Sequence, residues 1–212
     1  MTFDNRVAVV TGGAGRIGRP LCEKLAAAGV AIAVVDINAE GAEAEAEKIR
    51  QAGGKARGYG MDIQSSDNVR DASAGILADF GRVDILVNNA GVWRQQLIEE
   101  MAEAFWNFHM NLNLNGGFRV TMAFLPGMLE RKYGRIINVG SIAGEVGLPF
   151  FGAYATSKAG VLMFTKTLAM EVAKRGITVN CVSPGMIGDS PSGPIKQTWV
   201  ERWGTGPEVA DV

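Results

Sequence analysis

A tyrosine and a lysine are spaced as an acid–base pair on a helix would be. Tyr154 and Lys158 are four residues apart, so in a helix their side chains lie on one face, one turn from each other. An ammonium stabilises a neighbouring phenolate, so Lys158 is expected to lower the pKa of Tyr154 from its usual value of about 10. Tyr154 could then exchange a proton with a bound molecule, and Ser141, which follows an apolar run, could hydrogen-bond the same oxygen. A Tyr-x-x-x-Lys pair by itself is more often a surface pair.

A glycine-rich stretch near the N-terminus is suited to holding a phosphate group. Residues 11–18 have the sequence TGGAGRIG and lie between an apolar run and a helical pattern. Such a turn exposes backbone N–H groups, and the N-terminus of the next helix adds positive potential, so together they could hold a pyrophosphate. Glycine-rich turns are common, but the place of this one between a first strand and a helix is what dinucleotide binding requires.

Two aspartates end the strands that follow this turn. A carboxylate at Asp36 can accept hydrogen bonds from both ribose hydroxyls of an adenosine and repels a 2′-phosphate, which favours NAD over NADP. The alternative is that Asp36 only caps the next helix. Asp62, at the end of the third strand, could face the adenine, although alone it would mean little. Because the glycine-rich turn and Ser141 occur together with Tyr154 and Lys158, the Tyr-x-x-x-Lys spacing is not expected to be a coincidence.

The elements that must position these residues alternate between short apolar runs and longer helical patterns. Most of the runs are apolar throughout, which indicates strands buried on both faces of a parallel sheet. Strands are expected at residues 6–10, 30–35, 55–61, 83–87, 135–139 and 177–182. Helices are expected at 17–28, 39–52, 66–80, 99–130 (broken) and 152–175. This alternation predicts a doubly wound α/β sheet of the Rossmann type, with six strands, helices on both faces and a crevice at the carboxyl ends of the strands.

The composition favours a single domain, residues 1–212, and excludes several other classes of protein. The chain is 47% hydrophobic with a formal net charge of −1, which argues against a nucleic-acid-binding surface. It has no run of 18 apolar residues, and residues 1–6 lead into a strand without the layout of a signal peptide, so no membrane partner is expected. Two cysteines suit a cytoplasmic location. His109 is the single histidine, so neither a metal site nor a histidine-based triad is expected.

These residues together resemble the short-chain dehydrogenase/reductase family in its single-domain form. The resemblance runs from Val7 to Gly185 and returns weakly at residues 206–212. Its motifs are the turn at 11–18, Asp62, Asn-Asn-Ala-Gly at 88–91, Asn113, Ser141 with Tyr154 and Lys158, and Ser-Pro-Gly at 183–185. So many motifs, in order and at the family's spacings, make the resemblance specific. The chain resembles 3-oxoacyl-carrier-protein reductases and sugar or polyol dehydrogenases about equally.

The resemblance implies roles for the catalytic residues. Tyr154 would exchange a proton with the substrate oxygen, and Ser141 would position and polarise that oxygen. Lys158 would hydrogen-bond the nicotinamide ribose and lower the pKa of the tyrosine. Asn113 would hold a distortion of its helix and a water that passes protons to solvent. Trp93 and Phe151 are expected to border the substrate cleft.

The resemblance also implies a cofactor site. Asn89 would contact the adenosine side of the cofactor, and Ile187 would contact its carboxamide. The full expected set is Gly12, Arg16, Ile17, Gly18, Asp36, Ile37, Asp62, Ile63, Asn89, Tyr154, Lys158, Pro184, Gly185 and Ile187.

Three features depart from the family pattern. Arg16 replaces the middle glycine of the turn. Its guanidinium could pair with a phosphate of the cofactor, for example the 2′-phosphate of NADP. The alternative is that Arg16 faces solvent at the start of a helix. Asp189 stands where the family usually has threonine near the carboxamide, with Ser190 beside it. Residues 206–212 look like the opening of the family's last helix, and the seventh strand is missing, which suggests truncation and leaves residues 177–182 as an apolar edge strand.

The sequence therefore predicts an NAD-dependent oxidoreductase, with NADP as a second possibility, that interconverts a small secondary alcohol and its ketone. An NADPH-dependent 3-oxoacyl thioester reductase is the alternative within the family, although that branch usually prefers NADPH and Asp36 counts against it. A truncated, catalytically weak nucleotide-binding or assembly protein is the alternative from another class. The resemblance further implies a homodimer through the helices at 99–130 and 152–175, whereas a tetramer would need the missing segment.

Overall fold

The centre of the computed structural model is a parallel sheet whose strand order reverses once. The structure describes residues 3, 5–188 and 202–212. The strands are β1 (Val7–Thr11), β2 (Ala31–Asp36), β3 (Ala56–Gly60), β4 (Ile85–Asn88), β5 (Gly134–Val139) and β6 (Ile177–Val182). Their order is β3-β2-β1-β4-β5-β6, and all pair in parallel. The reversal between β1 and β4 opens a crevice at the carboxyl ends of these strands, so the predicted doubly wound fold is confirmed.

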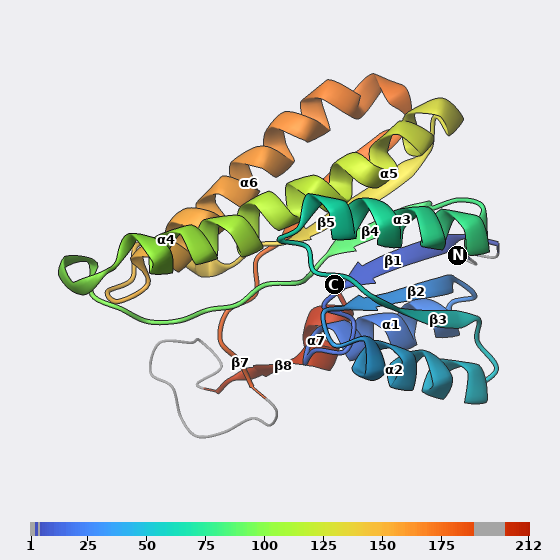
Figure 1. Ribbon diagram of the computed structural model, residues 1–212, viewed down its shortest axis with the longest axis horizontal. Coiled ribbons are helices and arrows are strands. Elements are labelled where there is room, and N and C mark those ends of the chain that lie inside the picture. Colours follow the sequence, from blue (N-terminus) through green and yellow to red (C-terminus); the bar gives the residue numbers. More distant parts are fainter. Residues whose placement is uncertain (1–2, 4, 189–201) are drawn as a thin grey trace.

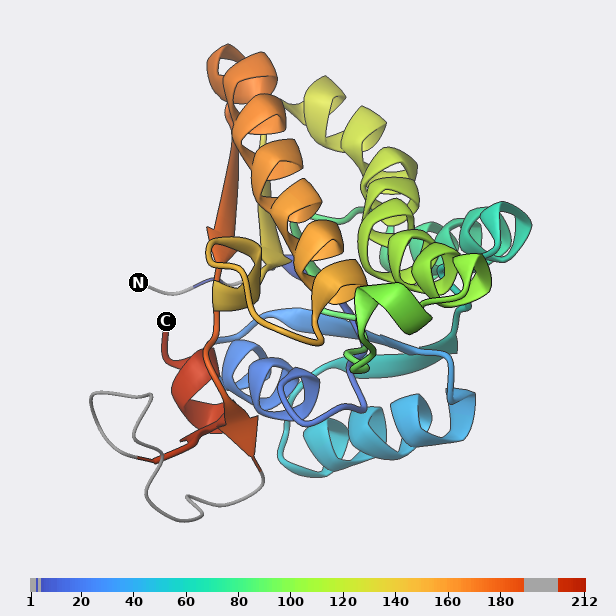
Figure 2. The ribbon, with the colours of Figure 1, turned by 90° about the vertical axis from the view of Figure 1, so that its left-hand side faces the viewer.

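Helices cover both faces of this sheet (Figures 1 and 2). One face carries α1 (Gly18–Ala27) and α2 (Ala39–Gln51). The other face carries α3 (Ser66–Phe80), α5 (Gly117–Arg131) and α6 (Gly152–Val172). Each face therefore has its own apolar core, as the uninterrupted apolar strands predict. No helix in the described ranges is both long and apolar enough to cross a membrane.

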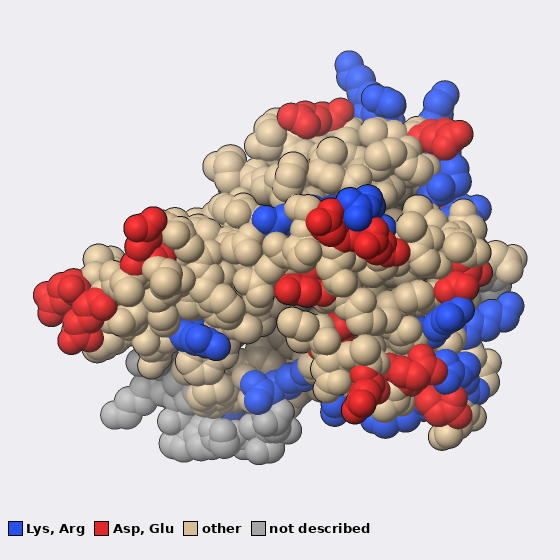
Figure 3. Space-filling view, in the orientation of Figure 1, with Lys and Arg blue, Asp and Glu red and all other residues tan. Residues whose placement is uncertain are grey.

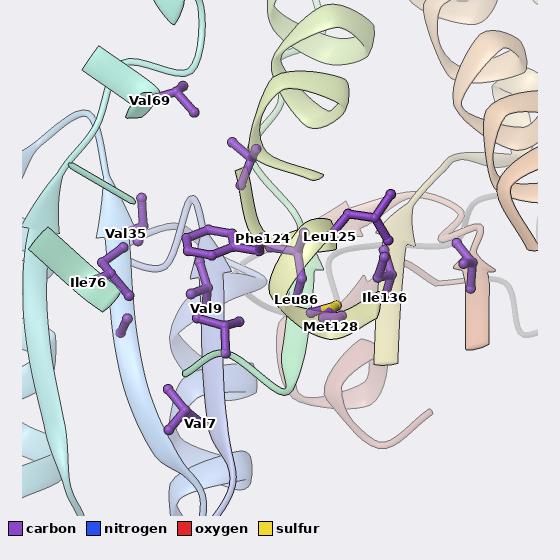
Figure 4. Packing of buried hydrophobic residues seen from close by; sticks show 14 of the residues in the cluster. Val7, Val9, Val35, Val69, Ile76, Leu86, Phe124, Leu125, Met128 and Ile136 are labelled. Carbon is purple, nitrogen blue, oxygen red and sulfur yellow. The ribbon is translucent and has the colours of Figure 1, made fainter. Parts of the chain in front are cut away.

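The larger core lies between the sheet and α3, α5 and α6. Alternate residues of the strands enter it, among them Val9 of β1, Leu86 of β4 and Ile136 of β5 (Figure 4). Phe124 and Met128 of α5 pack against them, one helical turn apart. This packing holds the helices that carry the acid–base residues in a fixed position above the strand ends.

The expected helix at residues 99–130 is divided into several pieces. Residues Ile98–Glu100 form the short helix η1, and α4 (Glu103–His109) leads into a π-helical segment, η2 (Met110–Gly116), before α5 begins. The two other short helices are η3 (Ile142–Gly144) and η4 (Ala173–Arg175). π-Helical segments inside α-helices are frequent at functional sites, and η2 contains Asn113.

The C-terminal residues pack against the beginning of the chain. Strands β7 (Ile187–Gly188) and β8 (Gly204–Thr205), which the sequence analysis did not predict, form a separate pair. The expected opening of a last helix is observed as α7 (Gly206–Ala210), which begins with a Thr205–Glu208 capping box. A Cβ at Gly206 would lie 2.2 Å from the carbonyl oxygen of Arg16, so α7 lies directly against the glycine-rich turn. Among the described residues no seventh strand joins the sheet, and β6 is at its edge.

Candidate active site

A cleft of about 410 Å³ lies over the carboxyl ends of the strands. In the space-filling view the surface is hollowed between the part that carries α4 and the part that carries α1 and α2 (Figure 3). This volume is within the range of small-molecule and cofactor sites. The lining includes most of the predicted site: Gly12, Arg16, Ile17, Asp36, Ile37, Asp62, Ile63, Asn89, Trp93, Ser141, Tyr154, Lys158, Pro184, Gly185 and Ile187.

The glycine-rich turn follows β1 and reaches close to the backbone around it. Gly12 has a φ of 63°, in the left-handed region, and a Cβ there would lie 3.0 Å from the Nδ2 atom of Asn89. A Cβ at Gly18 would lie 2.1 Å from the carbonyl oxygen of Gly12. Gly18 is not among the described lining residues of the cleft, so its expected contact with the cofactor stays a prediction. Its lack of a side chain lets α1 begin against the turn.

Asn89 and Thr11 hold this turn in place. The Nδ2 atom of Asn89 donates to the carbonyl oxygens of Thr11 and Gly12, at 2.9 and 3.1 Å. The hydroxyl oxygen of Thr11 accepts from the backbone N–H groups of Asn89 and Ala90, both at 3.1 Å. Asn89 lines the cleft, but its amide is engaged by the turn rather than left free for an adenosine. The sequence analysis missed Thr11, because its part depends on a loop that lies far away in the sequence.

Asp36 lies at the end of β2 beside the turn. Its Oδ2 atom accepts from the backbone N–H of Ala14 at 3.1 Å, and its Oδ1 atom accepts from the N–H of Asn38 at 3.0 Å. The residue that caps α2 is Asn38, whose side chain accepts from the N–H of Gly41. The alternative in which Asp36 caps the next helix is therefore wrong. Asp36 instead presents a carboxylate to the cleft from a fixed position.

Arg16 reaches across the cleft toward the C-terminal strand pair. Its Nη1 atom donates to the carbonyl oxygen of Ile187 at 3.4 Å. The side chain thus lines the cleft and does not simply point into solvent. Asp189 and Ser190, which the sequence analysis placed near the carboxamide, lie outside the described residues.

The features of this half of the cleft fit an adenine dinucleotide. Gly12 and Gly18 pack tightly at the start of α1, so backbone rather than side chains borders this position. The N-terminus of a helix favours the binding of a pyrophosphate there. The Asp36 carboxylate offers acceptors suited to a ribose diol. Ile37, which is largely exposed, and Ile63 provide apolar walls suited to an adenine.

Ser141, Tyr154 and Lys158 meet at the other end of the cleft. Ser141 follows β5, while Tyr154 and Lys158 lie on the first turns of α6. The Nζ atom of Lys158 lies 6.0 Å from the centre of the Tyr154 ring and donates to the carbonyl oxygen of Val139 at 2.7 Å. Lys158 is only 5% exposed, and this burial lowers its pKa to about 8, against a smaller opposite effect of Cys181.

The pKa of Tyr154 moves in the direction opposite to the expected one. Burial raises it above its usual value of 10, and the Ser141 hydroxyl offsets this rise only in part. The sequence analysis considered the ammonium of Lys158 but not the loss of water around the phenol. The expected lowering by Lys158 is therefore wrong for the protein without a bound ligand, in which the protonated form of Tyr154 is favoured.

Asn113 lies in the π-helical segment and fixes the loop after β4. Its Oδ1 atom accepts from the N–H of Val92, and its Nδ2 atom donates to the carbonyl oxygen of Val92, both at 2.9 Å. The same amide also donates to the hydroxyl of Ser157 at 3.1 Å. A Cβ at Gly91 would lie 3.2 Å from Asn113 Oδ1 and 3.4 Å from Lys158 Nζ, so this position has little room for a side chain. Asn113 borders a small cavity behind the main cleft, together with Lys158.

Arg119 of α5 connects the π-helical segment to the loop after β3. No motif or spacing in the sequence predicts this role. Its Nη2 atom donates to the side-chain oxygen of Asn111 at 2.8 Å. Its Nη1 atom donates to the carbonyl oxygens of Ile63 and Asn111, at 3.3 and 3.5 Å. Because Ile63 lines the cofactor half and η2 carries Asn113, this guanidinium links the two halves of the cleft.

The two expected substrate residues have different places. Trp93 lines the cleft, but Phe151 does not. The centre of the Phe151 ring lies 6.1 Å from that of the Trp93 ring and 6.0 Å from that of the Tyr154 ring. Phe151 is thus next to two residues that line the cleft, and its place at the border of the substrate cleft stays a prediction.

The chain is similar to known proteins over most of its length. A model of the short chain dehydrogenase family matches residues 6–198. The chain is 36% identical to 3-oxoacyl-[acyl-carrier-protein] reductase FabG of Escherichia coli, over all of this chain and 89% of that protein. It is 40% identical to the protein of the same name from Vibrio cholerae, over 88% of this chain and 75% of that protein.

Two solved structures are also similar. The NAD+-bound xylitol dehydrogenase has a TM-score of 0.86 and 35% identity, over 90% of this chain and 74% of that one. The structure of gox2181 has a TM-score of 0.92 and 33% identity, over 99% of this chain and 87% of that one.

Proposed function

The chain belongs to the short chain dehydrogenase family and is an oxidoreductase that acts on CH–OH groups with a nicotinamide cofactor, and we propose that it uses NAD(H) to interconvert a secondary alcohol and its ketone. The observation that carries this proposal is the convergence of Ser141, Tyr154 and Lys158 on one end of a cleft whose other end holds Asp36. The first end suits proton transfer to an oxygen, and the second suits an unphosphorylated ribose.

The side chains of the site have distinct tasks in this reaction. A nicotinamide cofactor held in the cleft would supply the hydride for the carbonyl carbon in reduction and would accept the hydride of the alcohol carbon in oxidation. Tyr154 gives its phenolic proton to the carbonyl oxygen in reduction and takes the hydroxyl proton in oxidation, which completes the balance of atoms and charge. Ser141 hydrogen-bonds the same oxygen and orients it toward Tyr154. Lys158 places a positive charge below the tyrosine, where it stabilises a phenolate.

The choice of NAD over NADP rests on Asp36. Its carboxylate is held by two backbone N–H groups at the end of β2, so it cannot easily turn away from a ligand. A 2′-phosphate close to this carboxylate would be repelled. The similarity to the NAD+-bound xylitol dehydrogenase supports this choice.

A second candidate substrate class is a 3-oxoacyl thioester. The similarity to the FabG reductases of Escherichia coli and Vibrio cholerae, at 36% and 40% identity, favours it. The reduction of a 3-oxo group to a 3-hydroxyl group would use Ser141, Tyr154 and Lys158 in the same way. The two candidates differ in what lies beyond the reacting carbon and in the preferred cofactor.

The test is a fluorescence titration of the chain with NADH and NADPH, followed by turnover assays. We expect saturable binding that is tighter for NADH, and reduction of at least one ketone from a panel of aliphatic ketones, aromatic ketones, ketoses and 3-oxoacyl thioesters. Tyr154→Phe should lower turnover at least a hundredfold and leave NADH affinity within about twofold. Binding without turnover of any member would instead support the catalytically weak nucleotide-binding protein.

We also propose that two copies associate through α5 and α6 in the cytoplasm. Both helices carry large apolar side chains that are exposed by about half or more: Phe118, Met122, Met163 and Met170. Several large apolar side chains left exposed on the same helices are typical of an interface. Sedimentation of the wild type and of Met163→Glu would test this, since the charge should shift a dimer toward monomer.

A further inference from the structure

The cleft wall beside Tyr154 carries a tryptophan that is largely exposed and yet firmly held. The Trp93 side chain lines the cleft and is 56% exposed. The residue before it, Val92, is bound at both its N–H and its carbonyl by the amide of Asn113. The ring of Phe151 lies beside the indole, with 6.1 Å between ring centres and a tilt of 32°. An apolar surface left in water and supported by a neighbouring ring, next to the reacting group, is what a ligand-binding wall requires.

The loops on either side of this wall are locked to each other. The N–H of Gln96 donates to the carbonyl oxygen of Phe150 at 2.9 Å. A Cβ at Gly152 would lie 2.9 Å from the Cγ1 atom of Ile98, so the two loops are in close contact. Phe150 has a φ of 69°, which is unfavourable for a residue with a side chain. Strain of this kind persists only where the surrounding structure enforces it, and it concentrates at ligand sites.

The charges of the cleft are concentrated away from this wall. The charged side chains among the described lining residues are Arg16, Asp36 and Asp62 in the cofactor half and Lys158 below the tyrosine. Exposed apolar side chains are also present on the two locked loops: Ile98, Val146, Leu148 and Phe150. These loops carry exposed charged residues as well, including Arg94 and Glu145, but none of those lines the cleft, whose wall beside Tyr154 is formed by the indole of Trp93.

From this wall we infer the class of substrate: an uncharged ketone, or the matching secondary alcohol, that bears an aromatic ring next to the reacting carbon and stacks it on Trp93. The inference rests on the proposed function, because Ser141 and Tyr154 must hold the oxygen of the same molecule. A flat ring gains an offset-stacked or edge-to-face contact with the indole beyond the burial of its area, whereas a flexible chain of equal size gains only burial. A polyhydroxylated chain would have to turn hydroxyl groups toward Trp93 and the apolar rim, at a cost in lost hydrogen bonds to water.

The test compares probes that differ only beyond the carbonyl. Acetophenone and 2-octanone are methyl ketones with the same number of carbons, while a ketopentose and a 3-oxoacyl thioester of N-acetylcysteamine represent the other classes. We expect the wild type to have its highest kcat/KM with acetophenone. Trp93→Ala should lower that value about tenfold, which corresponds to about 1.4 kcal/mol. It should lower the value for 2-octanone about threefold, and Trp93→Phe should retain most of the activity with acetophenone.

Two controls separate stacking from loss of structure. NADH affinity of Trp93→Ala should match the wild type, which shows that the cleft has formed. Trp106→Ala removes another exposed indole, on α4, and should leave all kcat/KM values unchanged. A wild-type preference for the ketopentose or the thioester over acetophenone would overturn the inference, as would an equal loss with all probes in Trp93→Ala.

The failure of this inference is distinguishable from the failure of the proposed function. Turnover of the ketopentose or the thioester that is abolished by Tyr154→Phe would keep the proposed function and refute the aromatic substrate class. Absence of turnover with every probe and either cofactor would refute the proposed function, and the aromatic substrate class would fall with it.

Discussion

The buried ammonium of Lys158 should make activity and stability change in opposite directions above pH 8. Its side chain is 5% exposed, and the loss of water around it lowers its pKa from an ordinary value of 10.5 to about 8. Its ammonium donates to the carbonyl of Val139, lies 6.0 Å from the centre of the Tyr154 ring and is affected by the thiol of Cys181. Between these two pKa values the folded chain holds fewer protons at this site than the unfolded chain does.

The stability contribution therefore has a definite sign. Below pH 8 the lysine is charged in both states, and the folded state bears the full cost of burying the charge. As the pH rises from 8 to about 10.5, the folded state loses its proton first, so the free energy of unfolding rises. The gap between the two pKa values corresponds to about 3 kcal/mol. Urea unfolding of the cofactor-free protein at a series of pH values measures it.

A matched variant isolates this contribution from the other groups that titrate in the same range. Lys158→Met keeps most of the length of the side chain and has no charge. The difference in the free energy of unfolding between the wild type and Lys158→Met should therefore rise from pH 8 to pH 10 by about 2 kcal/mol. A difference that stays constant across this range would show that the pKa of Lys158 is not lowered.

Activity should fall over the same interval. The kcat/KM for the cofactor reports the ionisation of groups in the free enzyme, and it should decrease about tenfold for each pH unit above 8 if the charge of Lys158 is required. In Lys158→Arg the guanidinium stays charged throughout, so the profile should be flat to pH 10 at a lower level. A flat wild-type profile, together with the rise in stability, would show that the pKa is lowered but that the charge plays no part in the reaction.

Three further predictions concern other groups. Asp36→Asn should lower the ratio of kcat/KM for NADH to kcat/KM for NADPH by roughly 10- to 100-fold. The substitution removes a negative charge whose repulsion of the 2′-phosphate is worth about 1.5–3 kcal/mol. An unchanged ratio would refute the ribose contact. Glu23 has a raised pKa because of partial burial and of the buried carboxylate of Glu45, so its ionised form destabilises the fold as the pH rises. Glu23→Gln should therefore raise the free energy of unfolding at pH 8 and leave it unchanged near pH 4; an equal gain at both pH values would contradict this reasoning. Arg119→Met should raise the KM for the cofactor and lower kcat, each about three- to tenfold, with partial rescue by Arg119→Lys; normal kinetics would show that the link through Asn111 is only structural.

The main sheet was predictable because its strands are buried on both faces. Strands β1 and β2 are apolar nearly throughout, and their predicted limits differ from the observed ones by one residue. Strand β3 gave a weaker signal, since an edge strand with an exposed face alternates polar and apolar residues. The pair β7–β8 was not predictable: each strand has two residues, and their pairing depends on the return of a distant segment.

The candidate site was predictable where its chemistry lies in the side chains themselves. Tyr154, Lys158 and Asp36 were found because their types and spacing suggest proton transfer and ribose binding. Thr11 and Arg119 were missed because each acts through backbone carbonyls or N–H groups of loops that are remote in sequence. Any residue type can supply the backbone group in such a hydrogen bond, so the sequence does not indicate the partner. These supporting contacts are therefore visible only in the three-dimensional structure.

The sign of the Tyr154 shift shows what spacing leaves out. An i, i+4 pair fixes the side of the helix that two groups share, but a pKa depends equally on how much water each retains. In the folded chain both groups are partly or fully buried, so the pKa of the phenol rises and that of the ammonium falls. At neutral pH the site thus combines a protonated Tyr154 with a Lys158 that is still mostly charged. A protonated phenol is the form that donates to a carbonyl, so this state is prepared for ketone reduction, whereas alcohol oxidation requires the phenolate and should be favoured by higher pH until Lys158 loses its charge.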